Sequence, residues 1–289
     1  MRRIQRLAIP VVALSLFLVA CGSDSDTTTD ETTVDTSAEV MTDDTMADDS
    51  ASAKIDIAAL GLIKDGAITV CTDAPYELFE YQDETTKEWT GFDMDLMKVI
   101  ATNIGDLSLE VTVQPFDGIW LAPAAGKCDV VASSMTITEE RTQAADFTDS
   151  YFDAFQSLLV RKADAETYTS LESLAGKTIA VQTGTTGETY ANENAKDSKI
   201  QSFDEASAMF LALESGQVDA VLQDYLINKE RADKQGTSAV SIKFEETPEQ
   251  YGFAVEKGNT ALLQILNKGI KDLRDSGDYD TIYNKYFIG

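Results

Sequence analysis

The sequence contains no histidine, and this absence excludes several kinds of site. A Ser-His-Asp triad, a Cys-His pair and any histidine-ligated metal centre need a residue that this chain does not have. Basic residues are also scarce, because 23 Lys and Arg stand against 50 Asp and Glu, for a formal net charge of −27. A polyanion of this strength does not bind nucleic acid or anionic lipid through a basic surface. We therefore expect no nucleic-acid partner, no metal site and no cofactor.

Cysteine is rare as well, with only Cys21, Cys71 and Cys128, which is too few for a disulfide framework. Cys71 lies near the end of one predicted strand and Cys128 at the start of another. If these strands are parallel neighbours, the thiols are offset by about 10–13 Å along them, whereas a bridge needs Cα atoms within about 7 Å. We expect two buried thiols, although two cysteines in an exported protein also suit a disulfide.

The N-terminal 53 residues are not expected to belong to the folded domain. Residues 1–6 carry three Arg, and residues 7–20 are almost all apolar. That stretch is shorter than the roughly 20 residues that span a bilayer, so we predict a signal peptide over residues 1–20. Residues 22–53 contain 10 acidic residues and no Lys or Arg. Such a composition predicts a disordered tether over residues 21–53.

The remaining chain alternates short β-branched runs with helical patterns, which predicts an α/β fold with parallel strands. Strands are expected at 67–71, 109–113 and 129–132, and a hairpin at 79–91. Helices are expected to start at Asp93 and Asp117, and a last helix to end at Gly277 before a short aromatic one. The second half repeats this order, with 179–183 resembling 68–72 and 216–219 resembling 126–129. We therefore predict two similar lobes with a ligand cleft between them.

Four sequence blocks occur together in order, at residues 72–80, 91–104, 133–141 and 182–188. Together they resemble the family 3 bacterial solute-binding proteins, which serve polar amino acid ABC transporters. The resemblance implies the two-lobed periplasmic-binding-protein fold, type II-like, with hinge strands near 158–160 and 251–254. The first lobe is then discontinuous, and the two lobes close on a ligand. The implied lobes are residues 54–158 plus 254–289 for lobe 1 and residues 161–251 for lobe 2.

The segment Leu18-Val19-Ala20-Cys21 resembles the lipobox of bacterial lipoproteins. This resemblance implies that Cys21 is diacylated and becomes the mature N-terminus. The alternative is ordinary cleavage after Ala20, which would leave a free cysteine.

Several polar residues suit a free amino acid, which presents a carboxylate, an ammonium and a side chain. Arg141 follows the expected helix cap Thr138, and an Arg fork matches a carboxylate in two hydrogen bonds. Thr185 and Glu188 have capping-box spacing, so a helix start there also favours an anion. Asp224 ends a strand, where α/β sheets place ligand contacts, and can take the ammonium.

The resemblance gives the matching positions these same roles, adds the backbone of Thr136 as a donor, and makes Tyr76 and Phe116 the rings around the ligand side chain. The complete predicted set is Asp73, Tyr76, Glu77, Phe116, Ser133, Ser134, Thr136, Arg141, Thr185, Thr186 and Asp224. Five members also have a structural explanation: Arg141 as a solvated helix residue, Asp224 and Thr185 as caps, and the two rings as core.

Asp73 and Glu77 would place two carboxylates beside two aromatic rings, an arrangement that suits a cationic side chain. We therefore rank Arg, Lys or ornithine first, neutral polar amino acids second, and Asp or Glu last. If Glu77 faces solvent instead, a neutral polar ligand such as glutamine fits better.

The sequence thus predicts an exported, monomeric lipoprotein that captures an amino acid without chemistry and delivers it to an ABC permease. The lipid would hold it at the outer face of the cell membrane, or on the periplasmic side. Two alternatives share the fold: a dehydratase acting on prephenate or arogenate, with Asp73 and Glu77 as an acid–base pair, and a sensory lobe that signals to a membrane kinase.

Overall fold

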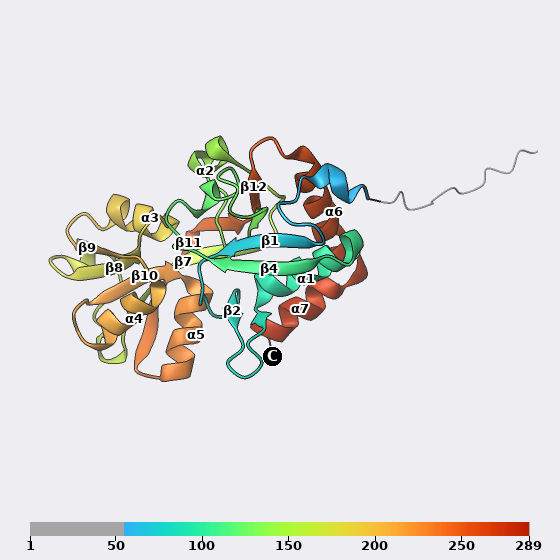
Figure 1. The fold of residues 1–289 in the computed structure, drawn as a ribbon. Coiled ribbons are helices and arrows are strands. Elements are labelled where there is room, and N and C mark those ends of the chain that lie inside the picture. The colour runs from blue at the N-terminus through green and yellow to red at the C-terminus, as the bar shows by residue number, and fades with distance from the viewer. Residues whose placement is uncertain (1–54, 289) are drawn as a thin grey trace, which may run out of the picture. The chain divides into compact units, whose positions relative to one another are not determined.

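Two mixed β-sheets with helices packed around them form the part of the chain described by the computed structural model, residues 55–288 (Figure 1). The predicted signal peptide, Cys21 and the acidic tether lie outside the described residues. Within residues 55–288, no helix is long and apolar enough to cross a membrane.

The first sheet has the strand order β4-β1-β5-β12-β6. Its central strand β1 (Ala67–Thr72) runs parallel to β4 (Ser108–Val113) on one side and to β5 (Val130–Val131) on the other. Strand β12 (Ala254–Glu256) is antiparallel to both β5 and β6 (Ala145–Phe147). The two short strands β2 (Tyr81–Gln82) and β3 (Trp89–Thr90) form the predicted hairpin.

The second sheet has the order β9-β8-β10-β7-β11. Strand β8 (Thr178–Gln182) runs parallel to β9 (Lys199–Phe203) and β10 (Ala220–Asp224). Strand β7 (Phe152–Arg161) is antiparallel to β10 and to β11 (Ser238–Tyr251). The order and the parallel or antiparallel sense match the first sheet strand by strand, so the predicted repeat of one α/β plan is confirmed.

The repeat extends to one side-chain contact in each sheet. The Asp129 carboxylate accepts the backbone N–H of Thr69 at 2.7 Å, and the Asp219 carboxylate accepts that of Thr178 at 2.9 Å. Both aspartates stand just before the third strand of their sheet. The recurring Asp in the two sequence motifs therefore ties neighbouring parallel strands together.

Helices cover the faces of both sheets (Figure 1). The helices of the first lobe are α1 (Phe92–Gly105), α2 (Glu139–Ala144), α6 (Thr260–Ser276) and α7 (Asp278–Phe287). Those of the second lobe are α3 (Thr186–Asn194), α4 (Ala206–Glu214) and α5 (Tyr225–Gln235). Single 3₁₀ turns occur at Ile57–Leu60, Ile119–Leu121, Lys162–Asp164 and Glu172–Leu174. Gly277 separates α6 from α7 in a left-handed conformation, φ 83°, as its position in the sequence predicted.

Strands β7 and β11 carry the chain between the two sheets and lie side by side, with Phe152 opposite Tyr251. Residues 158–160, predicted as the first hinge, already pair with β10 inside the second sheet. The crossing segment of β7 therefore lies earlier, at residues 152–155, where β7 pairs only with β11. After β11 the chain returns to the first sheet through β12 and ends in α6 and α7.

Two local predictions were wrong. The helix expected from Asp117 is only the short turn at Ile119–Leu121, because Pro123 cannot supply a helical N–H. Asp93 does not cap α1, since the N-cap is Gly91. The Asp93 side chain is instead buried, and its carboxylate accepts the Ser134 N–H and the Tyr151 hydroxyl.

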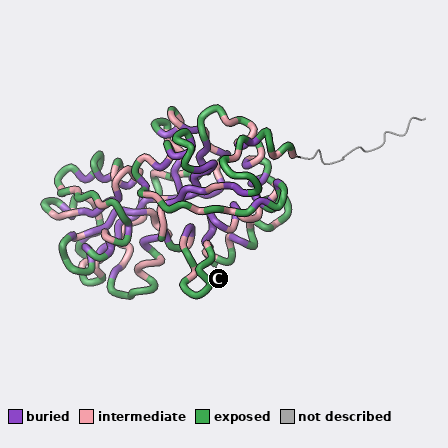
Figure 2. The backbone as a smooth tube through the Cα atoms, in the orientation of Figure 1, coloured by how far each residue is buried: buried purple, intermediate pink, exposed green. Residues whose placement is uncertain are grey.

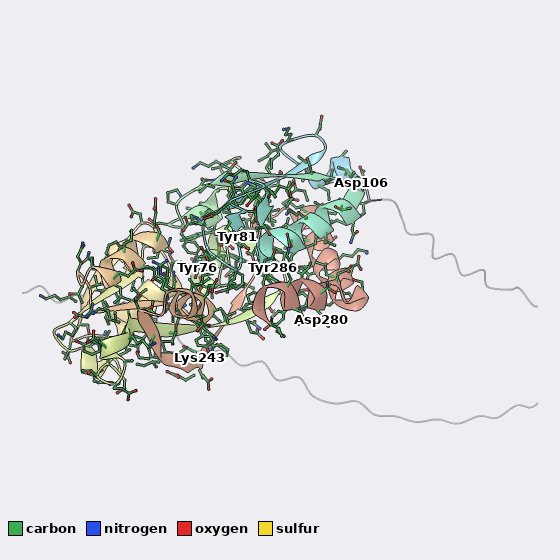
Figure 3. The ribbon with its side chains drawn as sticks, turned by 90° about the horizontal axis from the view of Figure 1, so that it is seen from below. Tyr76, Tyr81, Asp106, Lys243, Asp280 and Tyr286 are labelled. Carbon is green, nitrogen blue, oxygen red and sulfur yellow. A yellow bond between two sulfur atoms is a disulfide. The ribbon has the colours of Figure 1, made fainter. Side chains whose placement is uncertain are left out.

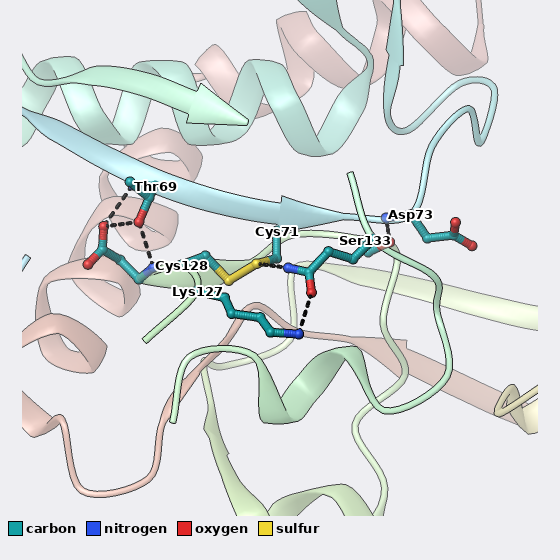
Figure 4. Close-up of a disulfide and its surroundings, with 8 residues drawn as sticks. Thr69, Cys71, Asp73, Lys127, Cys128 and Ser133 are labelled. Atoms are coloured by element: carbon teal, nitrogen blue, oxygen red, sulfur yellow. Dashed lines mark hydrogen bonds between the residues drawn. A yellow bond between two sulfur atoms is a disulfide. The ribbon is translucent and has the colours of Figure 1, made fainter. Parts of the chain in front are cut away.

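Cys71 and Cys128 form a disulfide, so the prediction of two free thiols was wrong (Figure 4). The expected offset of the two cysteines in sequence register exists: Cys71 lies opposite Val131, three residues after Cys128. However, β5 begins only at Val130, and the chain before it is not extended along β1. The spacing of a strand therefore does not apply to Cys128, and its Cα lies 5.7 Å from that of Cys71.

Buried positions follow the strands and the inner sides of the helices (Figure 2). An aromatic cluster lies where α1 and α7 meet the crossing strands. The Phe79 ring centroid is 5.1 Å from Phe152, 5.7 Å from Tyr251 and 5.3 Å from Phe287. This packing fixes the loop after β1 against the crossing strands, and that loop forms one wall of the cavity described next.

Candidate functional site

A cavity lies between the two lobes and takes its walls from both of them. The lining residues lie mainly in the loops after β1, β5 and β8 and at the end of β10, where parallel sheets place ligand contacts. They are Asp73, Tyr76, Glu80, Phe116, Ser133, Ser134, Thr136, Arg141, Gln182, Thr185, Thr186, Gln223 and Asp224. Every predicted ligand-binding residue except Glu77 is in this set.

Arg141 is a buried cation in this lining, with 4% of its surface exposed. Thr138 caps α2 as predicted, accepting the Arg141 backbone N–H at 3.2 Å. The guanidinium donates to the Thr136 carbonyl at 2.7 Å and to the Gly184 carbonyl at 2.9 Å, so it contacts both lobes. Burial lowers the pKa of Arg141 to about 10, and the group stays charged at neutral pH. Arg141 is therefore not a solvated helix residue.

Two aromatic rings flank the Arg141 guanidinium. Its central carbon is 5.2 Å from the Phe116 ring centroid and 5.1 Å from that of Trp120. Such contacts favour a cation in a site with little water. The guanidinium is thus held by carbonyls and rings rather than by a carboxylate, which leaves charge available for an anion.

The start of α3 lies beside Arg141. Thr185 caps this helix, accepting the Glu188 N–H at 3.1 Å, while Gly184 N–H donates to the Glu188 carboxylate at 2.8 Å. The predicted helix start at Thr185 and Thr186 is therefore confirmed. The guanidinium and the positive end of a helix meet at one wall of the cavity.

Asp224 lies at the end of β10 and makes no capping hydrogen bond to α5. Its carboxylate instead accepts from the Tyr76 hydroxyl at 2.8 Å, the Tyr251 hydroxyl at 2.6 Å and Gln156 Nε2 at 2.5 Å. Burial, together with the nearby Glu249, raises the pKa of Asp224 to about 6. Figure 3 shows Tyr76 where the two lobes meet, consistent with its bond to Asp224.

Asp73 also joins the lobes. Its carboxylate accepts from Gln182 Nε2 at 2.5 Å. Its backbone N–H donates to Ser133 Oγ at 2.9 Å, the bond drawn in Figure 4. Burial raises the pKa of Asp73 to about 6, against the opposing effect of the Gln182 hydrogen bond.

Glu77 lies outside the cavity, so its expected place beside the ligand is not observed. Tyr76 and Glu80 pair with each other across a tight loop, through N–H···O bonds of 2.8 and 2.9 Å. This pairing turns both of their side chains to the cavity lining and leaves Glu77 on the outside of the loop. There the exposed Glu77 forms an ion pair with Lys234 of α5 at 2.5 Å.

Three lining residues and one neighbour were not predicted from the sequence. Glu80, Gln182 and Gln223 line the cavity. The Glu249 carboxylate, on β11, accepts from the Thr136 hydroxyl at 2.6 Å and the Thr186 hydroxyl at 2.8 Å. Glu80 could have been found, because it lies in the first of the four sequence blocks, whereas nothing in the local sequence points to Glu249.

Within the described part of the chain, no cluster of three or more His, Cys, Asp or Glu side chains is arranged to hold a metal ion. The cavity combines one buried cation, a helix start and several carboxylates, with rings on two sides. This set can hold a small zwitterion without covalent chemistry.

Known proteins are similar to this chain in both sequence and fold. A family model described as bacterial extracellular solute-binding proteins, family 3, matches residues 68–289. The ABC transporter glutamine-binding protein GlnH of Bacillus subtilis (strain 168) is 32% identical, over 99% of this chain and 97% of its own. A structure of an ancestral arginine-binding protein bound to arginine is 39% identical with a TM-score of 0.72, over 77% of this chain and 98% of that chain. An ancestral amino acid-binding protein described as a precursor of cyclohexadienyl dehydratase is 36% identical with a TM-score of 0.73, over 80% of this chain and 99% of that chain.

Proposed function

Because the chain belongs to family 3 of the bacterial extracellular solute-binding proteins, we propose that it captures a free polar amino acid and delivers it to an ABC importer. The amino acid is held between the two lobes, which close on it. The matched relative of nearly full length, GlnH, is named as an ABC transporter glutamine-binding protein, which supports this role.

One observation carries the proposal: Arg141 and Asp224 line the same cavity with opposite charges. An amino acid zwitterion has one charge of each sign on adjacent carbons. Arg141 and the start of α3 receive its carboxylate, while Asp224 and Ser134 receive its ammonium. The Thr136 backbone adds a donor, and Tyr76 and Phe116 enclose the side chain.

A cationic side chain remains our first choice of ligand. Three carboxylates line the cavity, from Asp73, Glu80 and Asp224, against the single cation Arg141. Because Glu77 lies outside, the preference depends on Asp73 together with the two rings. Neutral polar ligands come second, in keeping with the glutamine-binding relative, and acidic amino acids last.

We propose no chemistry at this site, although one structural neighbour is described as a dehydratase precursor. The acid–base pair considered from the sequence does not converge, because Asp73 lines the cavity and the Glu77 carboxylate is paired with Lys234 outside it. Prephenate turnover is therefore not expected.

We also propose that residues 1–20 are a signal peptide and that a diacyl group on Cys21 anchors a monomeric protein to the membrane. The support is the basic and apolar pattern of residues 1–20, the lipobox-like Leu18–Cys21 segment and the acidic stretch that follows it.

Calorimetry against the twenty amino acids, ornithine and citrulline tests the proposal. A ligand at 100 times its Kd should also add about 2.7 kcal/mol to the free energy of unfolding. We expect arginine, lysine or ornithine to bind most tightly. Tighter binding of glutamate than of arginine would refute the charge argument, and turnover of prephenate would refute the absence of chemistry.

A further inference from the structure

Two buried carboxylates, from Glu80 and Asp93, contact the serines of the cavity lining, and Glu80 is itself part of that lining. Glu80 is 1% exposed and Asp93 is fully buried. Glu80 accepts from Ser133 Oγ at 3.2 Å with one oxygen and from Ser134 Oγ at 3.1 Å with the other. Asp93 accepts the backbone N–H of Ser134 at 2.9 Å. The proposed function counts Glu80 only as one of the carboxylates of the lining and assigns nothing to Asp93.

Ser134 is held in an unusual backbone conformation. Its φ is 46°, in the left-handed region that residues other than glycine seldom adopt. A residue keeps such a conformation only when its surroundings impose it. Its N–H donates to Asp93 and its hydroxyl donates to Glu80, and these two bonds fix both the backbone of Ser134 and the direction of its hydroxyl.

A serine hydroxyl has a single proton to donate and two lone pairs to accept with. Ser133 and Ser134 both give that proton to Glu80, and Ser133 also accepts the Asp73 N–H. Towards the cavity the two hydroxyls therefore present only lone pairs, which attract an ammonium and repel a carboxylate.

The second buried acid, Asp93, affects the protonation of Glu80. Burial, and after it the charge of Asp93, raise the pKa of Glu80 well above its ordinary value, while burial raises the pKa of Asp93 to about 7. Such a pair shares one proton near neutral pH. Asp93 Oδ1 is buried and has no hydrogen-bond partner among the described residues, whereas both oxygens of Glu80 are engaged. Both serine hydroxyls donate to Glu80, and these two hydrogen bonds oppose the rise of its pKa, which favours the form of Glu80 that accepts from both serines.

We propose that Glu80 is a positioning residue that makes Ser133 and Ser134 acceptors and so fixes which end of the amino acid they hold. This inference rests on the proposed function and deepens it. The ammonium is directed to Ser134 and Asp224, and the carboxylate is left to Arg141. Glu80 contributes to recognition through the two hydroxyls that it fixes.

Glu80→Gln tests the proposal at nearly constant volume. A carboxamide offers one accepting oxygen and one donating NH₂. One serine must then accept from the amide, and its own proton turns to the cavity, towards the ammonium. The exposed Glu88→Gln is the matched control, since Glu88 lies in the β2–β3 turn and does not line the cavity.

The measurement compares L-arginine with 5-guanidinopentanoate, which is arginine without its α-amino group, by calorimetry at neutral pH. If glutamine binds the wild type more tightly, glutamine and its desamino analogue replace them. In Glu80→Gln we expect affinity for the amino acid to fall about tenfold or more, and affinity for the desamino analogue to change by less than about threefold. An equal loss for both ligands, or no loss, would overturn the proposal and leave Glu80 a purely structural residue.

Ser134→Gly keeps the inference testable even if Glu80→Gln unfolds, because glycine accepts the left-handed conformation. This variant should also lose affinity for the amino acid selectively. In the Ser134→Gly background, Glu80→Gln should add less than about threefold, since both changes remove one interaction. Fully additive losses would contradict action through Ser134. If the wild type binds none of the amino acids, the proposed function itself is refuted. If the wild type binds but the variants distinguish the amino acid from its desamino analogue as well as the wild type does, only the role of Glu80 is refuted.

Discussion

Replacing Arg141 should abolish tight amino acid binding, because it is the one cation among the described residues that line the cavity. The side chain is 4% exposed, and two of its N–H groups bind the Thr136 and Gly184 carbonyls. Its other N–H groups have no hydrogen-bond partner among residues 55–288 and can donate to a carboxylate. In Arg141→Ala, a bound ligand carboxylate would be desolvated without a partner, at a cost of about 3–5 kcal/mol. That corresponds to a loss of about 10²–10⁴ in affinity.

One further variant separates the contribution of the charge of Arg141 from that of its planar shape, and another is a control. Arg141→Lys keeps the charge but loses the planar fork, so we expect an intermediate loss of about 10- to 100-fold. Arg274→Ala is the control: this arginine is exposed and donates to the Ser150 carbonyl, away from the cavity lining.

The assay is isothermal titration with the best ligand from the amino acid panel. Thermal unfolding should accompany it, since Arg141→Ala leaves two carbonyls without their donor and costs about 1–3 kcal/mol of stability. If Arg141→Ala is folded at the assay temperature and loses less than about fivefold in affinity, the carboxylate lies elsewhere and our assignment is wrong.

Four other predictions concern the disulfide, Asp224 and Cys21. Replacing Cys71 and Cys128 with serine should lower the free energy of unfolding by about 4 kcal/mol, because the bridge closes a loop of 57 residues and so restricts the unfolded chain. A denaturant midpoint equal to that of the wild type would contradict this. Asp224, with its pKa raised to about 6, must lose its proton to hold an ammonium, so affinity should fall roughly tenfold from pH 7 to pH 5 and the fall should be smaller in Asp224→Asn. The same raised pKa means that Asp224 adds stability below about pH 4 that is lost as the pH rises through 6, which urea titrations of the two proteins can detect. Finally, Cys21→Ser should abolish labelling with radioactive palmitate, and equal incorporation in both proteins would exclude lipidation at Cys21.

Features that depend on neighbouring residues could be predicted from the sequence. The helix starts at Thr138 and Thr185 are capping interactions between residues three apart, and both are observed. The strand and helix order followed from hydrophobic periodicity, and the end of α6 at Gly277 from a conformation that glycine prefers. The likeness of the two halves was visible for the same reason, because each half repeats one local pattern.

Several site features could not be predicted, because they depend on contacts across long stretches of chain. Glu77 and Glu80 are three residues apart and equally acidic, but the loop that pairs Tyr76 with Glu80 turns one carboxylate to the cavity and the other to Lys234. No periodicity applies to such a loop, so the sequence left both directions open.

What the sequence by itself determined is the alternation of strands and helices, the two-lobed plan and the residue types that suit a zwitterion. The tertiary structure alone decided that Cys71 and Cys128 meet, although strand spacing argued against it, because the chain before β5 is not extended. It also decided that Glu249 joins the Thr136 and Thr186 hydroxyls from a strand more than sixty residues away from either. The physical reason is the same in each case: side-chain direction and distance in irregular chain are set by packing against remote segments, which local patterns do not encode.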